Sequence, residues 1–554
     1  MGIDSVWNQP YLLFGQTLGI SALIAALPIF ALLLLLGVFR KPAWVAGVTG
    51  LGVTFVVALA AYHMPAQAAV SAALYGAAFG LFPISWIVFW AIALFRITVD
   101  TGKFEIIKAS VGRLTSDPRL QAILIGFAFG AFVEGAAGFG TPVAVAAAML
   151  TGLGFSPFNA AAICLLANTS PVAFGSIGIP VITLAGITGL PLDKLSADVG
   201  RLCAPISLII PGYLVVAMCG WRGLKGLLPA AAAAGVTFAA VQFTVSNFIG
   251  PQLTDILSSL AAMGAVILLL KFWSPSLPPS ATMHAAICGA SSAAQQTSGE
   301  EKHFSHREVF HAWLPYILLV VFVLLWGFKP WQAILNSVSF TFHWPALHNV
   351  VQRMPPVIPR PAPYAAVFNM NWLAASGTSC MFATILSALV LKVPLSAFLR
   401  LIVSVTRQLM LPTLTVTSVL AMAFLMNYCG ATGTLGLAFS ATGALFPFFS
   451  ALLGWLGVFL TGSDTSSNAL FGSLQVVTAD RLGLSPVLMA ATNSSGGVLG
   501  KMISLQTIAV AAAATGMSVP DQARLFRFTL KHSILLAGVV GCLAMIYTYV
   551  LRFA

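Results

Sequence analysis

Three ionisable residues stand in stretches of the chain that are otherwise apolar or rich in glycine. Glu134 is followed by three glycines and a proline within eight residues, Asp464 lies in a run of six polar side chains that begins at Ser463, and Lys501 follows a glycine-rich segment. A carboxylate at membrane depth is costly and marks a functional site by default. Because burial disfavours the charged form of a carboxylate, such a group can take up and release a proton. The residue types therefore predict proton coupling at Glu134 or Asp464, with the Lys501 ammonium pairing with an anionic substrate.

Hydroxyl and amide side chains accompany these charges and suit a small hydroxylated anion. Besides Lys501, the candidate substrate-binding residues are Asn168, Thr169, Ser170, Ser463, Asn493, Ser494 and Ser495. Backbone N–H groups at helix N-termini would add to an anion site. Sodium would accept the same oxygen ligands, so residue type alone leaves the coupling ion open.

Each of the three ionisable residues also has a purely structural interpretation. Glu134 could stand at a loop end beside a tight helix–helix contact, Asp464 could cap a helix in a plain loop, and Lys501 could reach lipid headgroups from an interfacial position. The order in which such segments recur in the two halves of the chain favours a functional site.

Composition places the whole chain in a bilayer. Of 554 residues, 59% are hydrophobic and only 7% are charged, and the mean hydropathy is +0.96. Soluble domains carry roughly a quarter of their residues as charges, so we expect an all-α polytopic membrane protein. The net charge of +12 sits in short loops between apolar spans and not in a basic, aromatic-rich stripe, which argues against nucleic acid as a partner.

Other function classes lack their characteristic residues. The seven cysteines show no CxxC spacing and the eight histidines form no metal-binding pattern, so we expect no cofactor and no metal. A membrane-embedded enzyme would need a nucleophile–base pair or metal ligands at depth, and neither glycine-interrupted region contains a histidine. A passive channel is the third class, and saturable uptake against a gradient would separate a carrier from it.

Hydropathy predicts 12–14 transmembrane helices and a division into two halves. The N-terminal half covers residues 1–273 with a broken repeat at about 120–190, a cytoplasmic polar linker covers 274–310, and the C-terminal half covers 311–554 with a second broken repeat at about 446–517. Basic residues mark cytoplasmic loops. Their placement predicts that both termini and the Pro-rich segment 330–363 lie outside.

An internal repeat relates the two broken regions. The sequence LGFSP at residues 153–157 recurs as LGLSP at 482–486, and each copy is preceded by an acidic Gly/Ser break and followed by an Asn-Thr/Ser-Ser break. The match of Asn168 to Asn493 implies that the second copy is four residues shorter, about one helical turn. Corresponding interrupted segments are the best sequence indication of a transporter binding site, and we expect the repeats to be inverted with the site near the midplane.

At these motifs the chain resembles the bacterial lactate permease family, whose members are L-lactate, D-lactate and glycolate proton symporters of the inner membrane. The resemblance covers essentially the whole chain and rests on EGAAGFGTP at 134–142, NTSPVAFG at 168–175, GWLGVFLTGSDTSSNA at 454–469 and GGVLGKM at 496–502. It implies a secondary transporter, not an enzyme, that takes up a 2-hydroxymonocarboxylate with a proton. Thr141 stands where close relatives are expected to carry Ala, and its hydroxyl would bear on substrate preference. A sodium-coupled carboxylate symporter or a carboxylate exchanger is the alternative.

Overall fold

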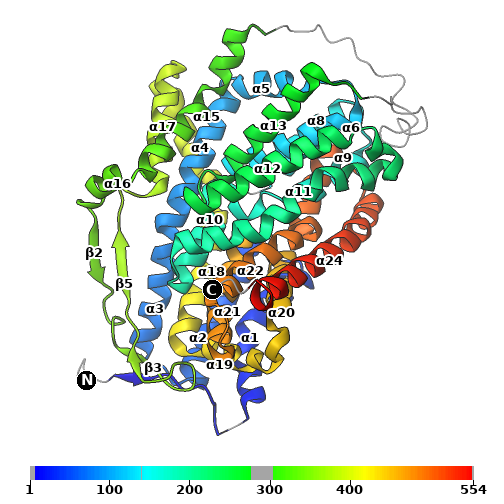
Figure 1. The fold of residues 1–554 in the computed structure, drawn as a ribbon. Helices are drawn as coiled ribbons and strands as arrows, with labels where there is room; N and C mark the ends of the chain where they lie inside the picture. The colour runs from blue at the N-terminus through cyan, green and yellow to red at the C-terminus, as the bar shows by residue number, and fades with distance from the viewer. Residues whose placement is uncertain (1–5, 16, 139, 276–303, 552–554) are drawn as a thin grey trace.

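The computed structural model describes residues 6–15, 17–138, 140–275 and 304–551, and most of these residues are helical (Figure 1). Eleven of its helices are long and apolar enough to cross a membrane, or up to 13 if each of two bent helix pairs counts as one span. The prediction of an all-α polytopic membrane protein is confirmed, and its count of 12–14 spans overlaps this range. A further apolar helix, formed by residues 376–390, is only 15 residues long.

The described helices of the N-terminal half precede the linker. In chain order they are α1 (Leu18–Gly37), α2 (Ala43–Val56) with η1 (Val57–Ala61), α3 (Ala66–Phe79) with η2 (Gly80–Ser85), α4 (Trp86–Asp100), α5 (Lys103–Gly112), α6 (Pro118–Gln121) with η3 (Ala122–Phe129), α7 (Gly130–Ala136), α8 (Thr141–Gly152), α9 (Pro157–Ala167), η4 (Val172–Phe174), α10 (Gly175–Thr188), α11 (Leu192–Lys225), α12 (Leu228–Phe248) and α13 (Thr254–Phe272).

Most of the predicted linker, residues 276–303, lies outside the described residues. The described residues resume at Phe304, and the Ser305 side chain accepts a hydrogen bond from the Glu308 backbone while the Glu308 carboxylate accepts one from the Ser305 N–H. This capping box starts the first described helix of the C-terminal half. The helices of this half are α15 (His306–Gly327), α16 (Lys329–Asn336), α17 (Ser376–Val390), α18 (Leu395–Cys429), α19 (Ala431–Phe439) with η6 (Ser440–Leu445), α20 (Phe446–Thr461), α21 (Asp464–Leu482), α22 (Pro486–Gly500), η7 (Lys501–Ile503), α23 (Leu505–Thr515) and α24 (Val519–Tyr549).

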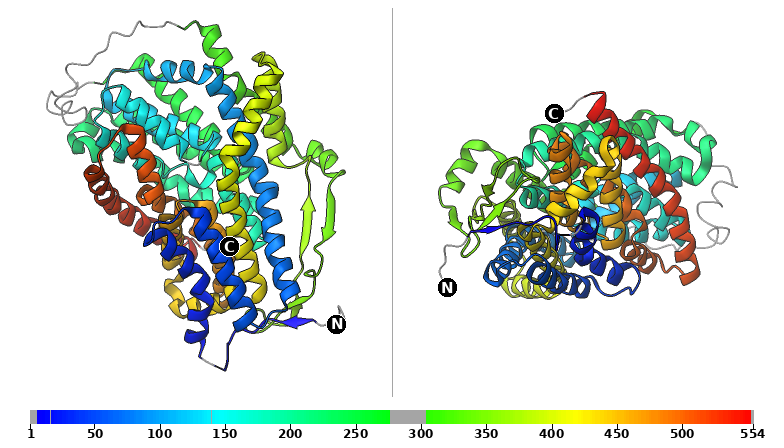
Figure 2. Two further views of the ribbon diagram at one scale, coloured as in Figure 1. Left: turned by 180° about the vertical axis from the view of Figure 1, so that it is seen from behind. Right: turned by 90° about the horizontal axis from the view of Figure 1, so that it is seen from below.

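The Pro-rich segment is more ordered than a loop. Strand β2 (Phe340–His343) pairs antiparallel with β5 (Val367–Met370), and β3 (Val351–Arg353) pairs with β1 (Trp7–Asn8) and β4 (Ala362–Pro363). Viewed from behind, these strands stand at one side of the helical body (Figure 2). The pairing of β1 with β3 puts the N-terminal segment beside the 330–363 region, and the side of the membrane on which both lie stays a prediction.

The two broken repeats contain the same elements in the same order, and equivalent positions are a constant number of residues apart. Three pairs of equivalent positions are each separated by 329 residues: Pro118 and Pro447 at the start of the first helix, Pro157 and Pro486 at the start of the third, and Val172 and Lys501 at the start of a 3₁₀ turn. Ser156 and Ser485 cap the third helices, each accepting a backbone hydrogen bond of 3.3 Å. The inference that the second copy is four residues shorter is therefore wrong, because the third helix and its 3₁₀ turn keep their combined length.

The third helix of each repeat is bent against the helix that follows it, by 65° in the first repeat and 44° in the second. In Figure 1 the elements α6, α8 and α9 of the first repeat lie above α20 and α21 of the second. Helix α21 packs directly against α10, where Gly472 leaves no room for a side chain next to Leu184. The Ser473 hydroxyl donates a hydrogen bond of 2.9 Å to the Ile187 carbonyl, so a side-chain-to-backbone hydrogen bond joins the two repeats in addition to packing.

The glycine-rich segment before Lys501 is a packing surface and not a break. Residues 486–500 are helical throughout, and a Cβ atom at Gly496 or Gly500 would lie 2.2 or 2.3 Å from a carbonyl oxygen of α20. Small residues allow two membrane helices to approach this closely. The predicted second Asn-Ser-Ser break is therefore wrong, because Asn493 lies inside this helix and the chain is interrupted only at residues 501–504.

Glycine ends the first helix of each repeat. Gly138 and Gly140 adopt φ of +60° and +82° between α7 and α8, and Gly462 adopts φ of +72° between α20 and α21, a conformation that other residues rarely adopt. Glu134 lies two residues before the end of α7, whereas Asp464 is the first residue of α21. The two carboxylates thus flank their breaks from opposite sides.

Candidate functional site

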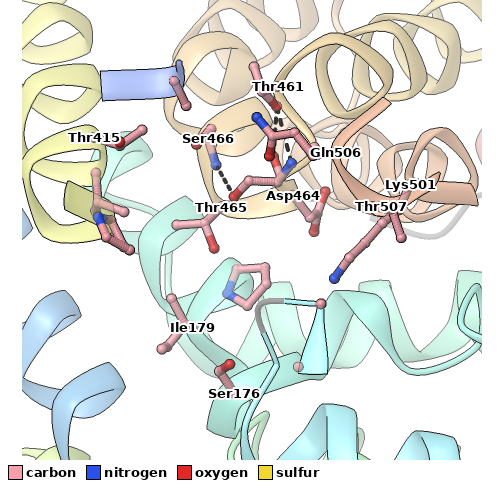
Figure 3. Close-up of a pocket in the computed structure, with 18 of the residues that line it drawn as sticks. Ser176, Ile179, Thr415, Thr461, Asp464, Thr465, Ser466, Lys501, Gln506 and Thr507 are labelled. Carbon is pink, nitrogen blue, oxygen red and sulfur yellow. Dashed lines mark hydrogen bonds between the residues drawn. The ribbon is translucent and has the colours of Figure 1, made fainter. Parts of the chain in front are cut away.

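A cavity of about 410 Å³ lies where the breaks of the two repeats meet (Figure 3). The repeats supply all its charged residues, and α2 and α18 close one side. Its lining includes Glu134, Gly140, Gly175, Ser176, Ile179 and Pro180 from the first repeat, Thr461 to Ser466, Lys501, Gln506, Thr507 and Val510 from the second, and Ala43, Trp44, Leu411, Pro412, Thr415 and Val416 from the other two helices. The prediction that segments of both halves form one pocket is therefore supported by the arrangement of these residues.

A buried ion pair spans the two repeats at the wall of this cavity. The Lys501 ammonium donates a hydrogen bond of 3.0 Å to Oε1 of Glu134, and the side chains are only 10% and 3% exposed. The other carboxylate oxygen of Glu134, Oε2, is buried and has no hydrogen-bond partner among the described residues. Gly175 makes room for the pair, since a Cβ atom there would lie 2.6 Å from Oε1. The glutamate is held by one exchangeable partner and by no other polar group that the structure describes.

Asp464 sits in a separate hydrogen-bond network on the second repeat. Its Oδ2 accepts hydrogen bonds from the Ser494 hydroxyl at 2.6 Å and from the Asn468 amide at 3.3 Å. Asn468 also accepts from Asn493 at 2.9 Å, and Asn493 accepts from Gln475 at 3.0 Å. The Asn468 amide further donates to the Pro180 carbonyl of the first repeat at 3.2 Å. This chain of amides fixes the Asp464 carboxylate in place across two helices.

The ammonium of Lys501 and the carboxylate of Asp464 point into the same space (Figure 3). With Glu134, the cavity wall carries two carboxylates and one ammonium. Such a site can bind a small anion at the ammonium, provided that one carboxylate becomes neutral, because an excess of buried negative charge is costly.

The other predicted residues divide into four groups. Ser463 lines the cavity and caps α21 by accepting a hydrogen bond from the Ser466 N–H. Asn168 and Thr169 line a small void together with Lys501 and Thr507, and Thr141 starts α8 next to Gly140. The last group is buried away from the cavity lining and consists of Ser170, Asn493, Ser494 and Ser495.

Several residues that line the cavity are not among the predicted site residues. Ser176, Thr461, Thr465, Ser466, Gln506 and Thr507 present polar groups to the cavity, and Thr415 does so from α18. Thr465 and Ser466 belong to the conspicuous polar run, but Gln506 and Thr415 are uncharged polar residues in largely apolar helices and lie in none of the motifs singled out in the sequence. Within the described ranges, no group of three or more His, Cys, Asp or Glu residues is placed to hold a metal ion.

Comparison with known proteins shows that the chain is similar to membrane permeases over nearly its whole length. The family model for L-lactate permease matches residues 21–551. Glycolate permease GlcA of Escherichia coli K12 is 44% identical over 98% of both chains, an L-lactate permease of Salmonella typhimurium is 43% identical over 99% of both, and one of Bacillus subtilis is 42% identical over 96% of this chain and 97% of its own. The solved structure of Neisseria gonorrhoeae MtrF, an antimetabolite efflux pump, aligns with a TM-score of 0.43 at 13% identity over 86% of this chain and 83% of its own, a likeness too weak to carry an argument.

The match extends across both repeats and every motif at which the sequence resembles the lactate permeases. The relatives are transport proteins and not enzymes, in keeping with many apolar helices around a buried ion pair. This chain is a multi-span membrane transporter that belongs to the L-lactate permease family.

Proposed function

We propose that this protein carries L-lactate and related 2-hydroxymonocarboxylates, D-lactate and glycolate, across the bacterial inner membrane into the cell together with protons. The names of its relatives support the substrate class. The observation that carries the coupling mechanism is the Lys501–Glu134 ion pair, because it joins the two repeats at the wall of the cavity.

In the proposed mechanism the substrate competes with Glu134 for Lys501. When the lactate carboxylate pairs with the ammonium, Glu134 is left buried with no partner, and an unpaired buried charge is strongly disfavoured. Glu134 then takes a proton from the water of the cavity. The net charge of the site is the same before and after loading, so both forms can cross the membrane without exposing a new charge to lipid. This favours Glu134 over Asp464 as the site of the transported proton.

In the proposed mechanism Asp464 gives the substrate a second polar contact in the cavity. Its Oδ2 accepts two hydrogen bonds from the protein, and we assign its other oxygen, Oδ1, which has no partner among the described residues, to the 2-hydroxyl group of the substrate. Ser494 and Asn493 act through Asp464 because they lie in the network behind it, while Asn168 and Thr169 line the small void beside Lys501. Thr141 and Ser463 add polar groups at the two breaks.

The lining of the cavity includes Ala43 and Trp44, which follow Pro42 after the basic loop residues Arg40 and Lys41. That basic loop is predicted to be cytoplasmic. We infer an inward-facing state. An inverted arrangement of the repeats would allow an exchange of their roles to open the other side.

Uptake into proteoliposomes separates the proposed coupling from its alternatives. Inside-alkaline vesicles without sodium should accumulate labelled lactate, and a proton ionophore should abolish the accumulation. Accumulation that ignores the pH gradient but follows a sodium gradient would overturn proton coupling. Movement only in exchange for internal carboxylate would show an exchanger.

A further inference from the structure

A third acidic residue lies next to the ion pair, outside the cavity lining. Asp255 is in the first turn of α13 and is 1% exposed. Helix α13 packs against α7, which carries Glu134, and the contact is tight because a Cβ atom at Gly135 would lie 2.8 Å from the Asp255 Cβ. Asp255 therefore lies directly against the helical turn that holds Glu134.

The carboxylate of Asp255 has no partner in the part of the chain that the structure describes. Both of its oxygens are buried without a hydrogen bond. The charged groups within its electrostatic reach are Glu134 on α7 and Lys501 on η7. The other described elements packed around α13, which are α12, α10 and η3, contain no Asp, Glu, Lys, Arg or His.

This arrangement decides the charge of Asp255. The ammonium of Lys501 is already bonded to Glu134 and faces the same cavity as Asp464, so an ionised Asp255 would be a third carboxylate near a single cation. A buried charge without a partner costs far more than the neutral acid. Like charges that share a site cannot both ionise, which leaves the proton on the carboxylate that lacks the ammonium.

We propose that Asp255 is a further proton-binding residue of the carrier, and that it keeps its proton throughout the transport cycle while Glu134 alone changes charge. The proposal rests on the proposed function, in which the substrate carboxylate replaces Glu134 as the partner of the Lys501 ammonium. When Lys501 passes to the substrate, one proton moves from cavity water to the Glu134 carboxylate, and Asp255 already holds its own. One proton therefore accompanies each monocarboxylate.

The protonation of Asp255 is open to a direct spectroscopic test. Infrared difference spectra of the full-length reconstituted carrier, without substrate at neutral pH, should show the carbonyl stretch of a protonated carboxylic acid. Asp255→Asn should remove that band, while Glu134→Gln should keep it. Asp193→Asn is the matched control, since Asp193 is an exposed aspartate in the first turn of another long helix. A band that survives in Asp255→Asn would overturn the proposal.

The claim that Glu134 alone changes charge is tested by counting the protons taken up on substrate binding, in the wild-type protein and in the variant. Lactate binding to the purified wild-type carrier should take up one proton per substrate, and Asp255→Asn should take up the same number and retain accumulation. Two protons in the wild type, or loss of one in the variant, would show that Asp255 ionises during the cycle. No proton uptake at all would instead reject the proposed coupling at Glu134, while the infrared band would still report on Asp255.

Discussion

The ammonium of Lys501 lies 3.0 Å from Oε1 of Glu134, although 367 residues separate the two in the chain. The pair links the 3₁₀ turn of the second repeat to the end of a helix in the first. It is therefore both a structural link between the repeats and the site at which an anionic substrate can displace a protein carboxylate.

Lys501→Gln should abolish uptake and destabilise the protein. Removing one partner of a buried ion pair leaves the other charge uncompensated, at a cost of about 3–5 kcal/mol. The double variant Lys501→Gln/Glu134→Gln should regain stability but not uptake, because the anion site is still missing. Thermal unfolding in detergent and labelled-lactate uptake measure the two effects. Lys271→Gln, at an exposed position, is the control, and equal stability of the single and double variants would contradict this account.

Gly175→Ala should impair transport with little effect on folding. The added methyl group would lie 2.6 Å from Glu134 Oε1, and the flexible end of the glutamate would move away and weaken its bond to Lys501. We expect uptake to fall at least about tenfold, which corresponds to about 1.4 kcal/mol. Gly264→Ala, at a helical glycine with no neighbouring atom within 4 Å, should have no effect. Normal uptake by Gly175→Ala would show that the position of Glu134 is not critical.

Ser494→Ala and Ser495→Ala should differ, although the residues are adjacent. Ser494 donates a 2.6 Å hydrogen bond to Asp464, whereas Ser495 contacts the thiol of Cys203. A hydrogen bond to a charged group contributes about 1.5–3 kcal/mol, so Ser494→Ala should raise the KM for lactate roughly tenfold or more. Ser495→Ala should stay near wild type. Equal KM values for the two variants would argue against a role of Asp464 in binding the substrate.

Gly496→Ala should destabilise the second repeat. Its Cβ atom would lie 2.2 Å from the Ala451 carbonyl oxygen, and backbone cannot move aside as a side chain can. Overpacking of this kind costs about 1–3 kcal/mol, so the midpoint of thermal unfolding in detergent should fall. Gly538→Ala, on a helix face with no atom within 4 Å, is the matched control. An unchanged midpoint would mean that the close contact of α20 and α22 is not required.

Sequence patterns predict the membrane class, the two repeats and the charged residues of the cavity. LGxSP marks the capped start of the third helix in both repeats, and Glu134, Asp464 and Lys501 are conspicuous because ionisable residues are rare in such surroundings. These signals are local, which is why they can be read from one sequence.

The parts that sequence patterns miss depend on tertiary contacts. The glycines before Lys501 suggest a break in the helix, but they allow α20 to pack closely against α22. That close contact depends on how the whole repeat folds and cannot be read from the local sequence. Asn493 matches Asn168 by residue type and yet lies inside a helix, whereas Asn168 follows the end of one. Asp255 resembles an ordinary acidic residue in a first helical turn, and only its packing against Gly135 reveals its relation to Glu134.

The central claim is that Glu134 couples substrate to proton, and Glu134→Gln tests it most directly. The variant cannot change charge, so Lys501 stays free for lactate and the loaded form can still cross the membrane. Vesicles that contain the variant should exchange internal for external labelled lactate at a rate comparable to wild type, yet fail to accumulate it in a pH gradient. Asp464→Asn measured in parallel shows whether the loss is specific to Glu134, and Glu105→Gln, at an exposed glutamate, is the neutral control. Accumulation at the wild-type level by Glu134→Gln would contradict the account.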